Sequence, residues 1–128
     1  MIQIDLNNPV ALEEQIAAAL RQALARREIR PGDELPSVRQ LAGDLGVHWN
    51  TVARAYRRLA DEALLIVRRG KSVVAQDPTP LPSKVSRARM HDRFAEAIST
   101  ALLGGVSHKH IAGVFRETLA EFQEQTKS

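Results

Sequence analysis

Apolar and polar residues follow two different periods in the first third of the chain. Over residues 2–6 they alternate, which predicts a short strand. Pro9 then opens a segment with the period of a helix that buries one face. Its apolar residues recur at every fourth position: Leu12, Ile16, Leu20 and Leu24. Pro31-Gly32 combines a fixed φ with a permissive one and predicts the turn after this helix.

Two short helices joined by a glycine-containing turn are predicted next. Ser37 precedes Gln40 by three residues, which is the capping-box spacing at a helix start. The buried positions of this helix are Val38, Leu41, Ala42 and Leu45. Gly46 interrupts the pattern after two turns, and a second helix begins at about His48. Its apolar face consists of Val52, Ala55, Tyr56 and Leu59. The pattern is typical of a helix-turn-helix over about residues 37–60.

A basic hairpin and a proline-rich linker follow. Residues 64–67 and 72–75 have the composition of strands, and they flank the basic turn Arg68-Arg69-Gly70-Lys71. A hairpin directly after a helix-turn-helix is called a wing, and we place it at residues 64–76. Three prolines in the next eight residues predict a stiff linker, which we place at 78–82.

Two further amphipathic helices are predicted between residues 83 and 128. Their apolar residues form one stripe on each helix: Met90, Phe94, Ile98 and Leu102, then Ile111, Phe115, Leu119 and Phe122. Gly104-Gly105 separates the two helices, and Ser107 can cap the second. Two helices of this length cannot enclose a core alone. The stripes must therefore pack on the rest of the chain or, as we favour, on a second copy in a homodimer.

Composition narrows the class of protein. The absence of cysteine excludes disulfides and thiolate metal sites and is typical of a reducing cytosol. The first residues lack the basic and apolar regions of a signal peptide. No apolar run approaches the roughly 18 residues that a membrane span requires. We therefore expect a soluble, cytoplasmic protein with no membrane partner.

Basic residues gather in one part of the chain, although the net charge of +3 is modest. From Arg54 to Lys71 there are six basic residues against two acidic ones. Such a local cluster indicates a polyanionic partner, and the alternative is a solvated surface.

Three motifs, in this order, resemble the GntR family of bacterial transcription regulators: PGDELPSVRQLAGDLGV, NTVARAYRRL and LLIVRRGK. The resemblance covers residues 9–77, and the short two-helix tail is similar to the small YtrA-like branch. It implies a mainly α-helical fold with a small β-wing. Residues 1–77 would form a winged helix-turn-helix DNA-binding domain, and residues 83–128 a helical dimerisation hairpin. It also implies a regulator, most often a repressor, that binds double-stranded DNA at a palindromic operator as a homodimer.

The chain departs from the usual pattern of this family in the wing, which reads GKSVV where GxGTF is usual, and at four positions in and around the second helix. Trp49 and Ala53 occupy places where arginines are frequent. His48 stands where Ser or Asn is the usual cap, and Ala63 where glycine often ends the helix. We therefore infer no DNA contact by analogy at positions 49 and 53.

Helical geometry, at about 100° per residue, sorts the residues of the second helix. Asn50 and Arg57 lie opposite its apolar face, with Arg54 close to them. The first residues of a recognition helix meet base edges in the major groove. Asn50 is therefore the candidate for base readout, because its amide can pair bidentately with adenine. The full set of candidate DNA-binding residues is Ser37, Arg39, His48, Asn50, Thr51, Arg54, Arg57, Arg68, Arg69, Gly70 and Lys71.

The other members of this set are expected to hold the DNA backbone. Thr51 and His48 can bind phosphates, helped by the positive end of the helix dipole. Arg39 matches the arginine of the family's PSxR motif, which implies a phosphate or base contact. The basic residues of the wing would clamp the backbone.

Trp49 and Arg58 each allow two interpretations. Trp49 lies only about 70° from the centre of the apolar face, so we favour a half-buried packing residue over a groove contact. Arg58 lies to the side of the outer face. It is therefore interpreted either as a DNA contact or as a solvated surface residue.

Three other classes of function are to be distinguished from DNA binding. An enzyme is not supported, because no catalytic arrangement or phosphate-binding loop is readable. A metal sensor would use His91, Asp92, His108 and His110, but two imidazoles two residues apart on a helix diverge by about 200°. We expect no metal and no cofactor. The third function is a protein-interaction module that has lost DNA binding, with Trp49 as its anchor. A small-molecule effector of unknown identity would have to bind beside the tail or at the dimer interface.

Overall fold

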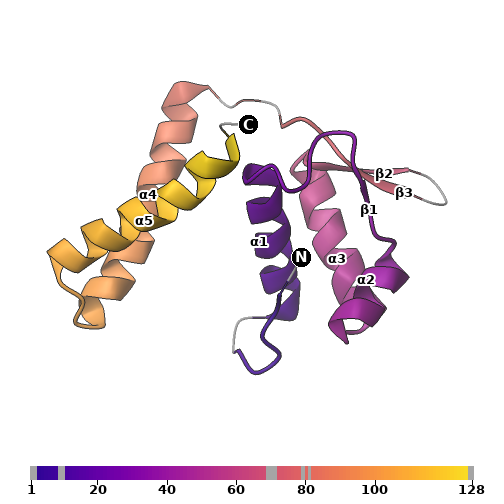
Figure 1. Cartoon of the computed structure of the whole chain (residues 1–128), viewed down its shortest axis with the longest axis horizontal. Helices are drawn as coiled ribbons and strands as arrows, with labels where there is room; N and C mark the ends of the chain where they lie inside the picture. The colour runs from indigo at the N-terminus through magenta and orange to yellow at the C-terminus, as the bar shows by residue number, and fades with distance from the viewer. Residues whose placement is uncertain (1–2, 9–10, 69–71, 79, 81, 127–128) are drawn as a thin grey trace. The chain divides into compact units, whose positions relative to one another are not determined.

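The protein consists of five α-helices and a small β-sheet among its described residues (Figure 1). The computed structural model describes the following parts of the chain: residues 3–8, 11–68, 72–78, 80 and 82–126. The chain divides into two compact units, Met1–Pro78 and Thr79–Ser128. The expectation of a mainly helical fold with a small sheet is confirmed. The elements are α1 (Leu12–Ala25), β1 (Glu34–Leu35), α2 (Val38–Leu45), α3 (Trp49–Asp61), β2 (Leu65–Arg68), β3 (Ser72–Ala75), α4 (Ser83–Leu103) and α5 (His108–Thr126).

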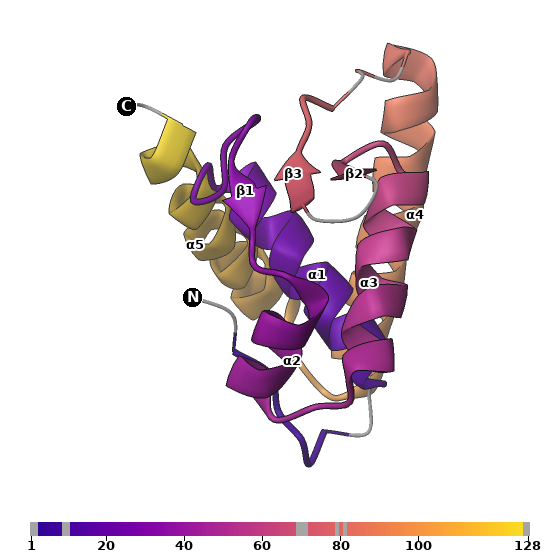
Figure 2. The same ribbon diagram turned by 90° about the vertical axis from the view of Figure 1, so that its right-hand side faces the viewer.

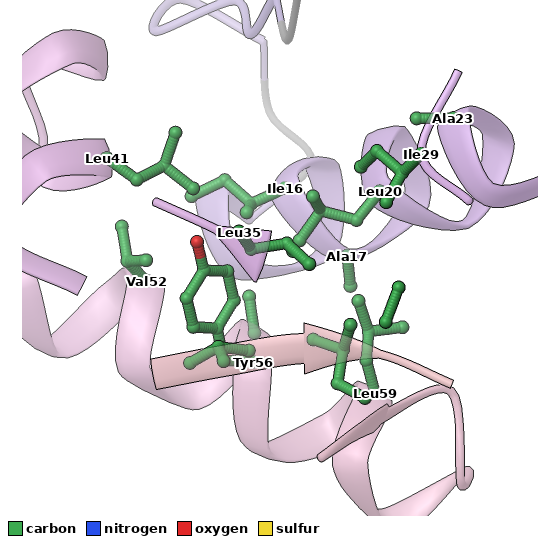
Figure 3. Close-up of a cluster of buried hydrophobic side chains, with 14 of the residues drawn as sticks. Ile16, Ala17, Leu20, Ala23, Ile29, Leu35, Leu41, Val52, Tyr56 and Leu59 are labelled. Carbon is green, nitrogen blue, oxygen red and sulfur yellow. The ribbon is translucent and has the colours of Figure 1, made fainter. Parts of the chain in front are cut away.

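The core of the first unit lies between α1, α2 and α3, with α3 in contact with both other helices (Figure 2). Ile16 and Leu20 of α1 point toward Val52 and Leu59 of α3, and all four are essentially inaccessible to water (Figure 3). Ile16 and Leu20 are four residues apart and Val52 and Leu59 are seven apart, and both spacings bring side chains to one face of a helix. Tyr56, expected in the core, is only 2% exposed. The apolar periods of the three helices therefore predicted the core correctly.

The sheet contains one strand more than the sequence predicted. The expected hairpin of β2 and β3 is confirmed, with pairs from Leu65 opposite Ala75 to Arg68 opposite Ser72. The additional strand is β1, which pairs antiparallel with the other edge of β3, so that the strand order is β1-β3-β2. The expected tip residues Arg69, Gly70 and Lys71 lie outside the described residues.

The predicted strand over residues 2–6 is wrong for the part that the structure describes. Residues 3–5 have no regular structure, and a turn begins at residue 6. The side chain of Gln15 in α1 supplies the partners that a neighbouring strand would supply. Its amide oxygen accepts from the Asp5 N–H at 2.9 Å, and its amide nitrogen donates to the Asp5 carbonyl at 3.1 Å. Ile4 nevertheless packs against the core, which accounts for the apolar position in the sequence.

The second unit is a hairpin of α4 and α5 (Figure 1). Phe94 of α4 meets Phe115 of α5 edge to face, with ring centroids 5.5 Å apart and an interplanar angle of 81°. The predicted cap of α5 is confirmed, since the Ser107 hydroxyl accepts from the His110 N–H at 3.1 Å. None of the described helices is long and apolar enough to cross a membrane.

Candidate nucleic-acid interface

The helix-turn-helix is fixed by a cap at the start of each of its two helices. At α2, the Ser37 hydroxyl accepts from the Gln40 N–H at 3.1 Å, and the Gln40 side chain accepts from the Ser37 N–H at 3.3 Å. This is the predicted capping box. Gly46 ends α2 in a left-handed conformation, with φ +71°. Glycine adopts this conformation at little cost because it has no Cβ. The turn to α3 is thus built into the local sequence.

His48 caps α3 with its imidazole. Its Nδ1 accepts from the Asn50 N–H at 3.1 Å, and its carbonyl accepts from the Thr51 N–H at 3.0 Å. A neutral imidazole that accepts at Nδ1 carries its proton on Nε2. Because the His48 side chain is exposed, this Nε2–H is a donor at the helix start, where the dipole favours an anion.

The outer face of α3 carries Asn50, Arg54 and Arg57. Both arginines are exposed, and Asn50 is half-buried in the first turn. Neither arginine forms an ion pair or a side-chain hydrogen bond within the described part of the chain. Two unpaired guanidinium groups beside an amide form a basic, hydrogen-bonding surface of about two turns. Such a surface can donate to phosphates and read base edges.

Two other arginines of the first unit are tied to acidic residues. Arg58 of α3 contacts Glu13 of α1, with Nη1 and Oε2 3.1 Å apart. The guanidinium group of Arg21 in α1 binds both carboxylate oxygens of Glu62. Its Nε donates to Oε1 at 3.1 Å, and its Nη2 donates to Oε2. These pairs join segments 45 and 41 residues apart and were not predicted from the sequence. The structure therefore separates Arg58 from the unpaired arginines of the same helix.

Four further candidates lie in the first turn of α3 or on neighbouring elements. Ser37 and Arg39, at the start of α2, are both exposed, and no ion pair of Arg39 is found among the described residues. Arg68 is exposed at the end of β2, next to the wing tip. Thr51 is half-buried in the first turn of α3. Of the candidate set, Arg69, Gly70 and Lys71 lie outside the described residues, and nothing tests their role.

Trp49 does not pack in the core, contrary to the interpretation that we favoured. Its side chain is 52% exposed, and Trp49 is not among the residues that pack on the described core. The buried stripe of α3 begins one turn later, at Val52. Angular position alone therefore did not predict the exposure of Trp49. The ring instead lies next to the His48 imidazole, with centroids 5.5 Å apart and planes inclined by 30°.

The histidines of the tail do not form a metal site within the described residues, where no group of three potential ligands comes together. His91 Nδ1 lies 3.2 Å from the carboxylate of its neighbour Asp92, and both side chains are highly exposed. His110 takes part in the cap of α5 through its backbone N–H. His108 is the first residue of that helix.

The geometry of a capped helix-turn-helix, a basic helix face and an adjoining hairpin agrees with the known proteins that the chain matches. The family described as bacterial regulatory proteins, gntR family, matches residues 12–74. The HTH-type transcriptional repressor YtrA of Bacillus subtilis is 30% identical over 122 residues, which is 95% of this chain and 88% of that protein. The HTH-type transcriptional regulator Rv1152 of Mycobacterium tuberculosis is 38% identical over 80 residues, which is 61% of this chain and 66% of that protein.

Solved structures agree with these matches. YtrA from Sulfolobus acidocaldarius, a GntR-family transcription factor, has a TM-score of 0.59 and 34% identity over 73% of this chain and 97% of that one. A transcriptional antiterminator from Listeria monocytogenes has a TM-score of 0.81 over 95% of this chain and 92% of that one. At 24% identity, this second likeness shows the fold alone. The expected absence of enzymatic activity is confirmed by the family, whose members regulate transcription by binding DNA. The chain belongs to the GntR family of bacterial transcription regulators.

Proposed function

We propose that the protein is a repressor that binds a palindromic operator as a homodimer through the outer face of α3. The observation that carries this proposal is the unpaired state of Arg54 and Arg57 beside Asn50, while Arg58 on the same helix is paired with Glu13. Repression would follow from occupation of a promoter. The name of the Bacillus subtilis relative, a transcriptional repressor, supports this sign of regulation.

The proposed division of labour separates base readout from backbone binding. Asn50 would pair with adenine in the major groove. Arg39, Arg54 and Arg57 would neutralise phosphates, as would Arg68 and the basic wing tip. Ser37, His48 and Thr51 would add hydrogen bonds to phosphates at the starts of the two helices.

A selection from random duplex DNA, with the full-length protein, tests the proposal. We expect enriched fragments that share an inverted repeat. On such a fragment, Asn50→Ala should weaken binding by about 1–3 kcal/mol and relax the preference at one base pair of each half-site. Arg68→Ala is the control, because a phosphate contact should weaken all sequences alike and lower the salt slope by about one. Equal loss on random and selected DNA for Asn50→Ala would refute its role in readout.

The homodimer is proposed from the apolar stripes of the tail. Met90, Phe94, Ile98 and Leu102 follow one another at every fourth position of α4, and each is 40–51% exposed in the single chain. On α5, Phe115 and Leu119 are also exposed, while Ile111 and Phe122 are half-buried. α4 has no fully buried residue at all. An apolar surface of this kind marks an interface, and a second copy with the same stripe is self-complementary to it.

A single charge in the stripe tests the dimer. Ile98→Glu should give the monomer mass of 14.2 kDa in light scattering, where the unchanged protein should give twice that mass. Thr100→Glu adds the same charge about 140° round α4 from the stripe and should leave the dimer intact. If both variants stay dimeric, or if the unchanged protein is a monomer, the proposed interface is wrong.

A further inference from the structure

The exposed indole of Trp49 has no structural role that the rest of the first unit explains. Its side chain is 52% exposed and is absent from the described core. Removing an indole from water is favourable in proportion to the area covered, so its exposure leaves apolar surface for a partner. Single exposed apolar residues are common on proteins. Trp49, however, is the first residue of α3, one position before the residue proposed to read a base.

His48 restricts where this indole can lie. The imidazole is fixed by its Nδ1 bond to the Asn50 N–H, and its ring lies 5.5 Å from the indole with planes inclined by 30°. The residue one turn along α3 is Ala53, so no long side chain stands at the position of this helix that faces Trp49 by spacing. The indole therefore lies beside a fixed ring, and its exposed apolar surface is available to a partner.

The chemistry of the indole limits what it can recognise in the major groove. It carries no charge, so it cannot neutralise a phosphate, and its only polar group is one N–H donor. The C5-methyl group of thymine is the one apolar group that a base pair presents in the major groove. An apolar ring at the start of a recognition helix is complementary to that methyl group.

We propose that Trp49 is a specificity-determining residue that packs on a thymine C5-methyl group, at a base pair next to the one read by Asn50. On α3 the two residues point about 100° apart, so they reach neighbouring positions of one half-site. His48 acts as a positioning residue for the indole. This inference rests on the proposed function, since it requires α3 to enter the major groove.

Replacement of thymine by uracil in the selected duplex removes the methyl group and leaves base pairing unchanged. With the unchanged protein, uracil at one thymine of a half-site should weaken binding about fourfold, which corresponds to one buried methyl group. Trp49→Ala should bind the thymine and uracil duplexes equally. The chain has a single tryptophan, so a change in emission when the selected duplex is added reports on Trp49 alone.

Leu103→Ala is the matched control, because Leu103 is an apolar side chain that is 90% exposed in the other unit. This variant should keep the full thymine preference. If uracil has no effect at any thymine, or the same effect in Trp49→Ala, the inference is refuted while the DNA-binding proposal stands. Uniform weakening of all sequences by Trp49→Ala, with no uracil effect, would place the indole on the sugar-phosphate backbone instead. A pool without enriched sequences refutes both proposals.

Discussion

The phenol of Tyr56 in α3 donates a hydrogen bond of 2.7 Å to the carbonyl oxygen of Pro36, which lies just before α2. It joins the two helices of the helix-turn-helix across 20 residues of chain. The ring is buried in the core, so this bond holds α3 at a defined distance from the start of α2 (Figure 3).

Tyr56→Phe should keep the fold and lower its free energy of unfolding. The ring still fills the core, but the Pro36 carbonyl loses its donor. A hydrogen bond of this kind contributes about 1 kcal/mol, and urea unfolding followed by circular dichroism would measure the difference. An unchanged free energy of unfolding would mean that water replaces the phenol without cost.

The same residue predicts a loss of stability at high pH. Burial raises the pKa of Tyr56 from its ordinary value of 10.0 to about 12. Its contribution is therefore complete below pH 10 and is lost between pH 10 and 12, because the phenol ionises more easily in the unfolded chain. The advantage of the unchanged protein over Tyr56→Phe should shrink across this interval. Since the chain has one tyrosine, tyrosinate absorbance in folded and urea-unfolded protein gives both midpoints.

Arg54 and Arg58 should differ in what their loss costs. Arg54→Gln removes an unpaired, exposed charge, so it should weaken DNA binding and lower the salt slope by about one, with stability unchanged. Arg58→Gln breaks the partly exposed pair with Glu13, which should cost less than about 1 kcal/mol of stability and leave the salt slope unchanged. Mobility shifts at several salt concentrations separate the two variants. Equal salt slopes would contradict the division between paired and unpaired arginines.

Ala63→Gly should stabilise the protein. Ala63 follows the end of α3 with φ +61°, where the Leu64 N–H bonds to the Leu59 carbonyl at 2.9 Å. This conformation costs a residue with Cβ roughly 1–2 kcal/mol. That cost exceeds the loss of stability caused by the greater conformational entropy of glycine in the unfolded chain. We expect a net gain of about 0.5–1 kcal/mol in thermal or urea unfolding. Ala60→Gly, inside α3, is the control and should cost about 1 kcal/mol.

The elements that the sequence predicted well are those whose signals are local. The capping box at Ser37, the left-handed Gly46 and the apolar periods of the helices depend on residues within a few positions of one another. β1 was not predicted because a two-residue strand has no period. It exists only through its pairing with β3, about 40 residues later.

For the candidate site too, the sequence predicted the local features and missed those that depend on distant residues. Helical geometry predicts that Asn50, Arg54 and Arg57 point outward. In the structure both arginines are exposed, while Asn50 is half-buried. Helical geometry does not predict which arginines are paired with a carboxylate, because Glu13 and Glu62 lie in segments distant in the sequence from their partners. The error at Trp49 has a related cause. A helical projection gives the angle of a side chain but not the position along the axis at which the neighbouring helices stop covering it.

The last prediction concerns a chain truncated after Asp77. It should fold, because every residue of the described core cluster lies between Ile16 and Ala75. It should also be monomeric, since it lacks the proposed dimer stripes of α4 and α5. Without the second half-site contact held nearby, operator affinity should fall by on the order of a hundredfold or more.

Circular dichroism, light scattering and a mobility shift on one preparation measure all three properties of the truncated chain. The full-length variant Ile98→Glu is the matched control, because it should lose the dimer while keeping the tail. If both proteins are monomers and show the same drop in affinity, the tail acts on DNA binding through dimerisation alone. A truncated chain that is still a dimer, or a monomer that binds the palindrome as tightly as the full-length protein, would show that the tail has another role.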